Sequence, residues 1–117
     1  MDVRRLVDEQ GRVVVERCEV ANSLWTRGRG LLGRTRLGEG EGLFITRTSS
    51  IHTFFMRFPI DVVFLDRRLR VRSIAHAVKP NRISIRFGGG NVVELAAGEA
   101  TRVGIRTGSR IAFYDET

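Results

Sequence analysis

Short strand-like segments separated by compact turns occupy most of the chain beyond residue 40, and they restrict the fold more than any other feature. Turn-forming groups such as Asp66-Arg67-Arg68 and Gly88-Gly89-Gly90 separate them. Short strands at close spacing favour a sandwich or an open barrel. The predicted strands are residues 42–46, 51–56, 60–66, 69–78, 83–87, 91–96 and 110–114.

The N-terminal part of the chain predicts a β-hairpin followed by a helix. Residues 3–7 and 12–20 are strand-like, and Gly11 gives the turn between them a permissive backbone. Glu16 interrupts the apolar alternation of the second strand. Between residues 21 and 33 the apolar period changes to that of a helix, although Gly28 and Gly30 each cost about 1 kcal/mol relative to alanine. The helical stripe consists of Ala21, Leu24, Trp25, Gly28, Leu31 and Leu32.

These patterns together predict a mainly β fold, an open barrel or β-sandwich with one short α-helix. A further single helical turn is expected at residues 98–103. A length of 117 residues fits one domain, so residues 1–117 are predicted to form a single domain. No stretch is long and apolar enough for a membrane span, and residues 1–5 do not lead into a signal peptide, which predicts a cytoplasmic protein.

The chain is arginine-rich and basic, with a formal net charge of +7. Lys79 is its single lysine, so the other 19 of its 20 basic residues are arginines, spread without a dense block. Non-specific attraction to polyanions at low salt follows from this charge, and specific nucleic-acid binding is not expected. Cys18 is the only cysteine, which excludes a disulfide within the chain and a paired-cysteine zinc site. No metal or cofactor is predicted.

Four sequence blocks occur in an order that resembles a prokaryotic family, domain-of-unknown-function family 192. The longest is Ile51-His52-Thr53-Phe54-Phe55-Met56-Arg57-Phe58-Pro59-Ile60-Asp61-Val62-Val63-Phe64-Leu65-Asp66. The others are Arg27-Gly28-Arg29-Gly30-Leu31-Leu32-Gly33-Arg34, Gly42-Leu43-Phe44, and Val93-Glu94-Leu95 with Gly98 and Gly108.

The resemblance spans about residues 12–112 and implies a small, mostly β domain with a short helix and no settled activity. The chain departs from the family pattern at three places. Leu32 stands where methionine is usual, Phe58 where asparagine is frequent, and Ser109 where aspartate is frequent.

The run Gly28-Arg29-Gly30-Leu31-Leu32-Gly33 matches the spacing of a dinucleotide-binding loop. Its glycines fall late in the helical stripe rather than at its start. The preceding strand also carries Glu16, Arg17 and Glu19, which is unlike a buried parallel strand. Close packing of the helix on the sheet is therefore favoured over nucleotide binding.

Five ionisable residues in the matching blocks are the candidate site. Carboxylates in apolar strands must find a donor or stay protonated, and cations in the other blocks can supply one. One hypothesis is a structural ion-pair network that fixes the helix on the sheet. Another is a cleft for a small polar or anionic ligand. The candidate ligand-binding residues are Arg27, Arg34, His52, Asp61 and Glu94.

Three function classes stay open at this point. The first is a binding module for a small polar or anionic ligand. The second is an interaction or accessory protein whose polar cluster is purely structural. The third is an enzyme in which His52 acts with Asp61 or Glu94 as acid and base, since these residue types suit proton transfer.

Overall fold

The computed structural model describes residues 2–21, 37–46, 50–52, 58–80, 83–85 and 90–114. Within 50–52 and 83–85 it describes the backbone alone. The elements are β1 (Asp2–Val7), β2 (Val13–Ala21), β3 (Glu41–Thr46), β4 (Ser50–His52), β5 (Ile60–Leu65), β6 (Val71–Val78), β7 (Ile83–Ile85), β8 (Asn91–Ala96), α2 (Glu99–Val103) and β9 (Ala112–Phe113).

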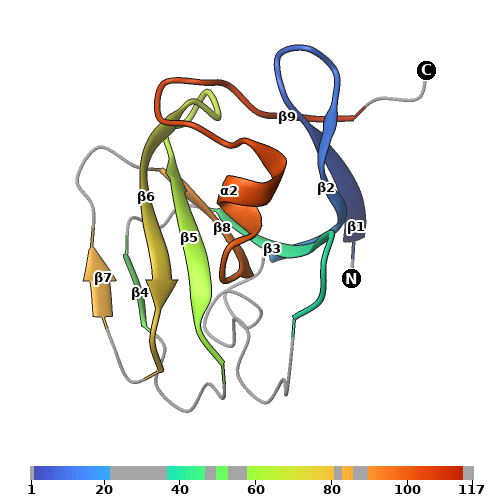
Figure 1. Cartoon of the computed structure of the whole chain (residues 1–117). Helices are drawn as coiled ribbons and strands as arrows, with labels where there is room; N and C mark the ends of the chain where they lie inside the picture. The colour runs from blue at the N-terminus through green and yellow to red at the C-terminus, as the bar shows by residue number, and fades with distance from the viewer. Residues whose placement is uncertain are drawn as a thin grey trace.

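Seven of these strands form one curved sheet, a half-barrel, in the order β6-β5-β8-β3-β2-β1-β9 (Figure 1). Its described neighbours are antiparallel except for β2 and β3, which run parallel. Strands β4 and β7 pair as a separate two-stranded sheet on the β5–β6 side of the molecule (Figure 1). The prediction of a mainly β fold with one short helix is therefore confirmed. Of the two predicted architectures, the half-barrel corresponds to the open barrel.

The N-terminal hairpin forms as expected, and a bulge accounts for its broken alternation. Arg4 pairs with Cys18 and Leu6 with Val15, so β2 carries one more residue than β1 between these pairs. Val15 and Cys18 are three positions apart, so in a regular strand they would point to opposite faces. The extra residue lets both reach the same core cluster. Glu16, Arg17 and Glu19 make this strand unlike a buried parallel strand, yet β2 pairs in parallel with β3. Val15 and Cys18 are fully buried, whereas Glu16 and Arg17 are exposed.

The two hairpin turns, β1–β2 and β5–β6, are built in the same way. An aspartate opens each one, Asp8 or Asp66, and its Oδ1 accepts hydrogen bonds from the backbone N–H groups two and four residues further on. Three residues after each aspartate the backbone has a positive φ, 80° at Gly11 and 64° at Leu69. These bonds hold the pKa of both carboxyl groups below its ordinary value.

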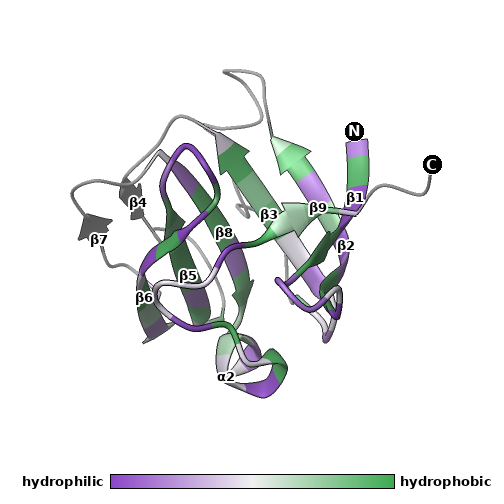
Figure 2. Ribbon diagram, turned by 90° about the horizontal axis from the view of Figure 1, so that it is seen from above, coloured by the Kyte–Doolittle hydropathy of each residue, from purple (hydrophilic) through white to green (hydrophobic). Residues whose placement is uncertain are grey.

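Strand β5 lies in the middle of the core and is buried along its whole length. Its odd-numbered residues Val63 and Leu65 join one apolar cluster, and its even-numbered residues join a second on the other face of the sheet. Helix α2 packs on the first face, which we call the α2 face, through Ala100. Figure 2 shows the apolar stretches of β5, β8 and β3 side by side. We call the other face the Glu94 face; it carries Leu43, Ile45, Ile60, Val62, Phe64 and Val92.

The helix predicted at residues 21–33 cannot begin at Ala21, which is the last residue of β2. Its side chain is fully buried against the Glu94-face cluster, so the sheet continues through the first position of the helical stripe. The rest of that prediction lies outside the described residues. The predicted helical turn at 98–103 is confirmed as α2. No helix in the described ranges is long and apolar enough to cross a membrane.

Gly42 on β3 faces α2 where side chains from two neighbouring strands fill the space above it. A Cβ atom at this position would lie 2.9 Å from Leu95 Cδ2 and 3.0 Å from Val15 Cγ1. Both atoms belong to buried side chains, so neither can withdraw without disturbing the core.

We expect Gly42→Ala to destabilise the protein by about 1–3 kcal/mol through overpacking. Urea unfolding monitored by circular dichroism measures the change. Gly90→Ala is the matched control, because a Cβ atom there would lie no closer than 3.2 Å to any neighbour, and it is expected to cost less than about 1 kcal/mol. Equal losses in the two variants would contradict close packing above Gly42.

Candidate functional site

Two buried carboxyl groups lie on neighbouring strands but on opposite faces of the sheet. Asp61 on β5 is opposite Leu95, whereas Glu94 on β8 is opposite Val62. Directly opposed residues share a face, and successive residues alternate between faces. Asp61 therefore belongs to the α2 face and Glu94 to the face named after it. The expectation that these two carboxyl groups converge is wrong, because the register of β5 and β8 separates them.

Asp61 is a structural residue that fixes helix α2 to the centre of the sheet. Its Oδ2 accepts hydrogen bonds from the N–H groups of Gly98 and Ala100, both at 3.0 Å. Gly98, the N-cap residue, provides no side-chain cap of its own. The carboxylate of Asp61 thus caps the helix from a distant strand, and its negative charge suits the positive end of the helix dipole.

The same carboxylate also supports a bulge in the edge strand β6. Ile60 pairs with Val78 and Val62 with Ala75, so β6 has one extra residue beside Asp61. Ala77 lies in this bulge with a φ of 50°, and its N–H donates to Asp61 Oδ1 at 2.9 Å. Three backbone donors therefore satisfy a side chain that is fully buried.

Glu94 lies in an apolar row that crosses three strands. Its cross-strand neighbours are Leu43 on β3 and Val62 on β5, both in the Glu94-face cluster. The residue is 4% exposed, and its Oε2 has no hydrogen-bond partner among the described residues. Glu41 lies two residues from Leu43 on the same side of β3, but its carboxylate accepts the N–H of Gly38 at 2.7 Å. Within the described ranges, Glu94 is thus a buried acid without a partner.

Burial raises the pKa of Glu94 from 4.5 to about 7. Desolvation disfavours the ionised form, and in the described part of the chain no cation offsets it. The carboxyl group can therefore hold or release a proton near neutral pH. A carboxyl group with this property can donate a hydrogen bond to a polar molecule or accept one from it.

The three cationic candidates are less fully described. Arg27 and Arg34 lie outside the described residues. His52 is the last residue of β4, where its backbone pairs with Ile83. Its side chain lies outside the described part of the structure. A role for these residues in ligand binding therefore stays a prediction.

Sequence reasoning missed Glu99, the third buried acid. Its Oε1 accepts the N–H of Gly40 at 2.9 Å and a guanidinium N–H of Arg102 at 2.8 Å, so it ties α2 to the β2–β3 connection. Hydrogen bonding to Arg102 holds the pKa of Glu99 below its ordinary value. Its three-residue spacing from Arg102 in a predicted helical turn is the signal that could have found the pair.

Cys18 is a buried core residue rather than a nucleophile. It is 0% exposed in the α2-face cluster, and burial raises the pKa of its thiol to about 12. The thiol is therefore protonated at neutral pH. No group of three or more possible metal ligands is found in the described part of the chain.

The curved sheet and the helix that Asp61 caps define a small half-barrel domain with three buried acids, of which Asp61 and Glu99 are hydrogen-bonded and Glu94 has an unsatisfied oxygen. The chain belongs to the family DUF192, "Uncharacterized ACR", whose model matches residues 5–113. This match confirms the resemblance seen in the sequence blocks and extends it toward the N-terminus. No curated protein matches the chain.

Solved structures share this fold. A protein of unknown function from Novosphingobium aromaticivorans is 27% identical with a TM-score of 0.81, and the match covers 94% of this chain and 83% of that one. A protein from Sinorhizobium meliloti, described as a candidate transcription regulator, is 25% identical with a TM-score of 0.83, covering 95% and 92%. These neighbours show the fold and assign no function.

Proposed function

We propose that this domain is a binding module for a small polar or anionic ligand, and that the ligand contacts Glu94 on the Glu94 face of the sheet. The unsatisfied carboxyl oxygen of Glu94 carries the proposal. Leaving a buried polar group without a partner costs about 1–3 kcal/mol. A purely structural role would not explain that cost, because among the described residues Glu94 fixes nothing in place.

Asp61 shows by contrast what a structural acid looks like in this fold. It is as deeply buried as Glu94, yet it accepts three backbone hydrogen bonds that join β5, β6 and α2. Buried charged groups with a structural role are normally paired in this way. An acid kept unpaired with a pKa of about 7 is typical of sites where a ligand completes the hydrogen bonding.

In this proposal Glu94 binds a hydrogen-bond donor of the ligand, such as a hydroxyl or amino group. Arg27, Arg34 and His52 contribute the positive charge that binds its acceptor or anionic groups. These three residues are included on the basis of the sequence prediction, and the two arginines are tested by substitution below. The ligand class that fits both parts is a compact molecule with donor and acceptor groups together, such as a sugar or an amino acid.

The test is an NMR titration of the labelled protein with neutral monosaccharides and with the common amino acids. We expect one of these probes to shift the amide signals of Leu43, Val62 and Glu94 in a saturable manner. Glu94→Gln is expected to weaken that binding about tenfold or more, because a charged hydrogen bond contributes about 1.5–3 kcal/mol.

Glu41→Gln is the matched control, since it removes an acid from the same side of β3 that is already satisfied by Gly38. It should leave the affinity unchanged. If no probe shifts the signals around Glu94, or if Glu94→Gln binds as tightly as the wild type, the proposed role of Glu94 is wrong. Arg27→Gln and Arg34→Gln with unchanged affinity would remove the arginines from the site.

A further inference from the structure

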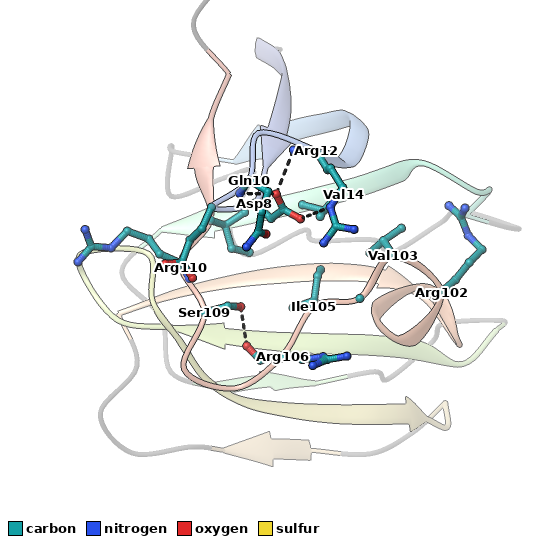
Figure 3. A pocket seen from close by; sticks show the side chains of 13 residues that line it. Asp8, Gln10, Arg12, Val14, Arg102, Val103, Ile105, Arg106, Ser109 and Arg110 are labelled. Carbon is teal, nitrogen blue, oxygen red and sulfur yellow. Dashed lines mark hydrogen bonds and ion pairs between the residues drawn. The ribbon is translucent and has the colours of Figure 1, made fainter.

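A cavity lies at one end of the α2 face. It has a volume of about 420 Å³ and is bounded by the β1–β2 turn, the end of α2 and the segment that leads into β9 (Figure 3). In Figure 1 these three segments meet at the end of the molecule that also holds the β5–β6 turn. Pockets of roughly 300–1,000 Å³ are typical of small-molecule sites. The cavity does not include Glu94, so it is independent of the function proposed above.

Apolar side chains line the inner part of this cavity. Val14 and Ile105 are 5% and 8% exposed, and both belong to the α2-face cluster. Val103, at the end of α2, packs against the same cluster. Figure 3 shows Val103 and Ile105 between the arginines Arg12 and Arg106. The cavity therefore offers an apolar inner surface beneath a charged rim.

The charges around the cavity favour an anion. Its lining contains four arginines and two acids, which are Asp8 and Glu9. Both acids are already engaged: Asp8 holds its own turn, and Glu9 Oε1 accepts the N–H of Arg110 at 3.0 Å. The four arginines outnumber the two acids, so the lining carries a net positive charge.

The individual arginines differ in how free they are. Arg102 is paired with Glu99, and Arg12 reaches Asp8 only through Nε, at 3.1 Å, so its terminal N–H groups stay available. Arg106 has no ion pair among the described residues. The hydroxyl of Ser109 donates to the carbonyl oxygen of Arg106 at 2.6 Å and holds the turn that presents it.

The carbonyl groups at the C-terminal end of α2 do not repel an anion in this cavity. Helix carbonyls attract cations, but here the N–H of Gly104 donates to Thr101 and that of Ile105 to Ala100. The helix has only five residues, so its dipole is small. The guanidinium groups therefore determine the sign of the local potential.

We infer that this cavity is a second binding site, for a small organic anion whose carboxylate or phosphate contacts Arg106 and Arg12 and whose apolar body packs on Val103 and Ile105. Guanidinium groups bind carboxylates and phosphates with two parallel hydrogen bonds. An inorganic ion would leave the apolar inner surface in contact with water. The anionic head and the apolar body are therefore both required.

Three probes separate these requirements in an NMR titration at low salt. Phenyl phosphate has both the anionic group and the apolar ring, inorganic phosphate has the anionic group alone, and phenol has the ring without the anionic group. We expect phenyl phosphate to shift the amides of Gly104, Ile105 and Arg106 saturably, and at least about tenfold more tightly than inorganic phosphate. Phenol is expected to bind more weakly than phenyl phosphate.

Arg106→Gln is expected to weaken phenyl phosphate binding about tenfold, and Arg106→Lys to recover part of that loss by restoring the charge. Arg106 is exposed, so both variants should keep the wild-type melting temperature. Arg67→Gln is the control, because it removes the same charge from the β5–β6 turn, outside the cavity. Equal weakening by Arg67→Gln, equal affinity for the two phosphates, or no saturable shift would each overturn the inference.

Discussion

Replacing Glu94 with glutamine is expected to stabilise the folded protein by roughly 2–3 kcal/mol at about pH 8, because the substitution removes a buried charge without changing the shape of the side chain. The folded carboxyl has a pKa of about 7, against an ordinary value of 4.5. Between these two pH values the unfolded chain releases a proton that the folded protein keeps. Wild-type stability should therefore fall as the pH rises from about 4.5 to about 7.

The difference in stability between Glu94→Gln and wild type should depend on pH. Below about pH 4.5 the carboxyl group is protonated in both states, so Glu94→Gln and wild type should differ little there. Above about pH 7 the full cost of the buried charge is present, and the variant should be the more stable. Urea unfolding at the two ends of this range measures the difference.

A control of opposite sign is available at Glu99. Its pKa is lowered by hydrogen bonding to Arg102, so the ionised form stabilises the fold. Glu99→Gln should therefore lose stability at neutral pH and differ less from wild type in acid. If Glu94→Gln also lost stability at about pH 8, Glu94 would have to be paired in the folded protein.

Asp61→Ala is expected to lower the free energy of unfolding by roughly 3–5 kcal/mol. Three backbone N–H groups, those of Ala77, Gly98 and Ala100, would lose their acceptor, and each unsatisfied buried donor costs about 1–3 kcal/mol. Small domains have a total stability of about 5–15 kcal/mol, so a large share is lost. Helix α2 should loosen first, because its cap is removed.

Hydrogen exchange and urea unfolding together measure this change. The amides of Gly98 and Ala100 should lose protection in Asp61→Ala before the strands do. Asp66→Ala is the control: that aspartate also accepts two backbone hydrogen bonds, but in an exposed turn where water replaces it. An Asp61→Ala variant within about 1 kcal/mol of wild type would show that the carboxylate does not hold α2.

The strands could be predicted from the sequence because their signals are local. Apolar alternation and turn residues fixed the hairpin at Gly11 and the strand at 91–96, which the structure reproduces as β8. The buried acids were also visible, since Asp61 and Glu94 each stand among apolar residues. A carboxylate in such a run is unusual enough to mark a position of interest.

The arrangement of those acids could not be predicted, because it depends on pairing between distant segments. One residue of register decides whether a side chain faces α2 or the opposite side. The sequence does not contain that register, and bulges in β2 and β6 shift it further. For the same reason the capping of α2 by Asp61, from 39 residues away at Ala100, was not foreseen.

Glu94 and Asp61 thus illustrate two outcomes for an acid in a β-sheet core. Asp61 meets three donors because a bulge and a helix end are both brought to it. Glu94 meets apolar neighbours on β3 and β5, and no donor among the described residues. The proposed ligand function depends on this second environment.

An NMR titration of the Glu94 side-chain carboxyl carbon measures that environment in the folded protein. An acid without a protein partner should titrate near pH 7 and shift downward when a ligand donates a hydrogen bond to it. A titration at or below the ordinary value of 4.5 in the ligand-free protein would mean that a cation of the chain already pairs with Glu94. The acid would then be a structural residue, and the proposed site would be lost.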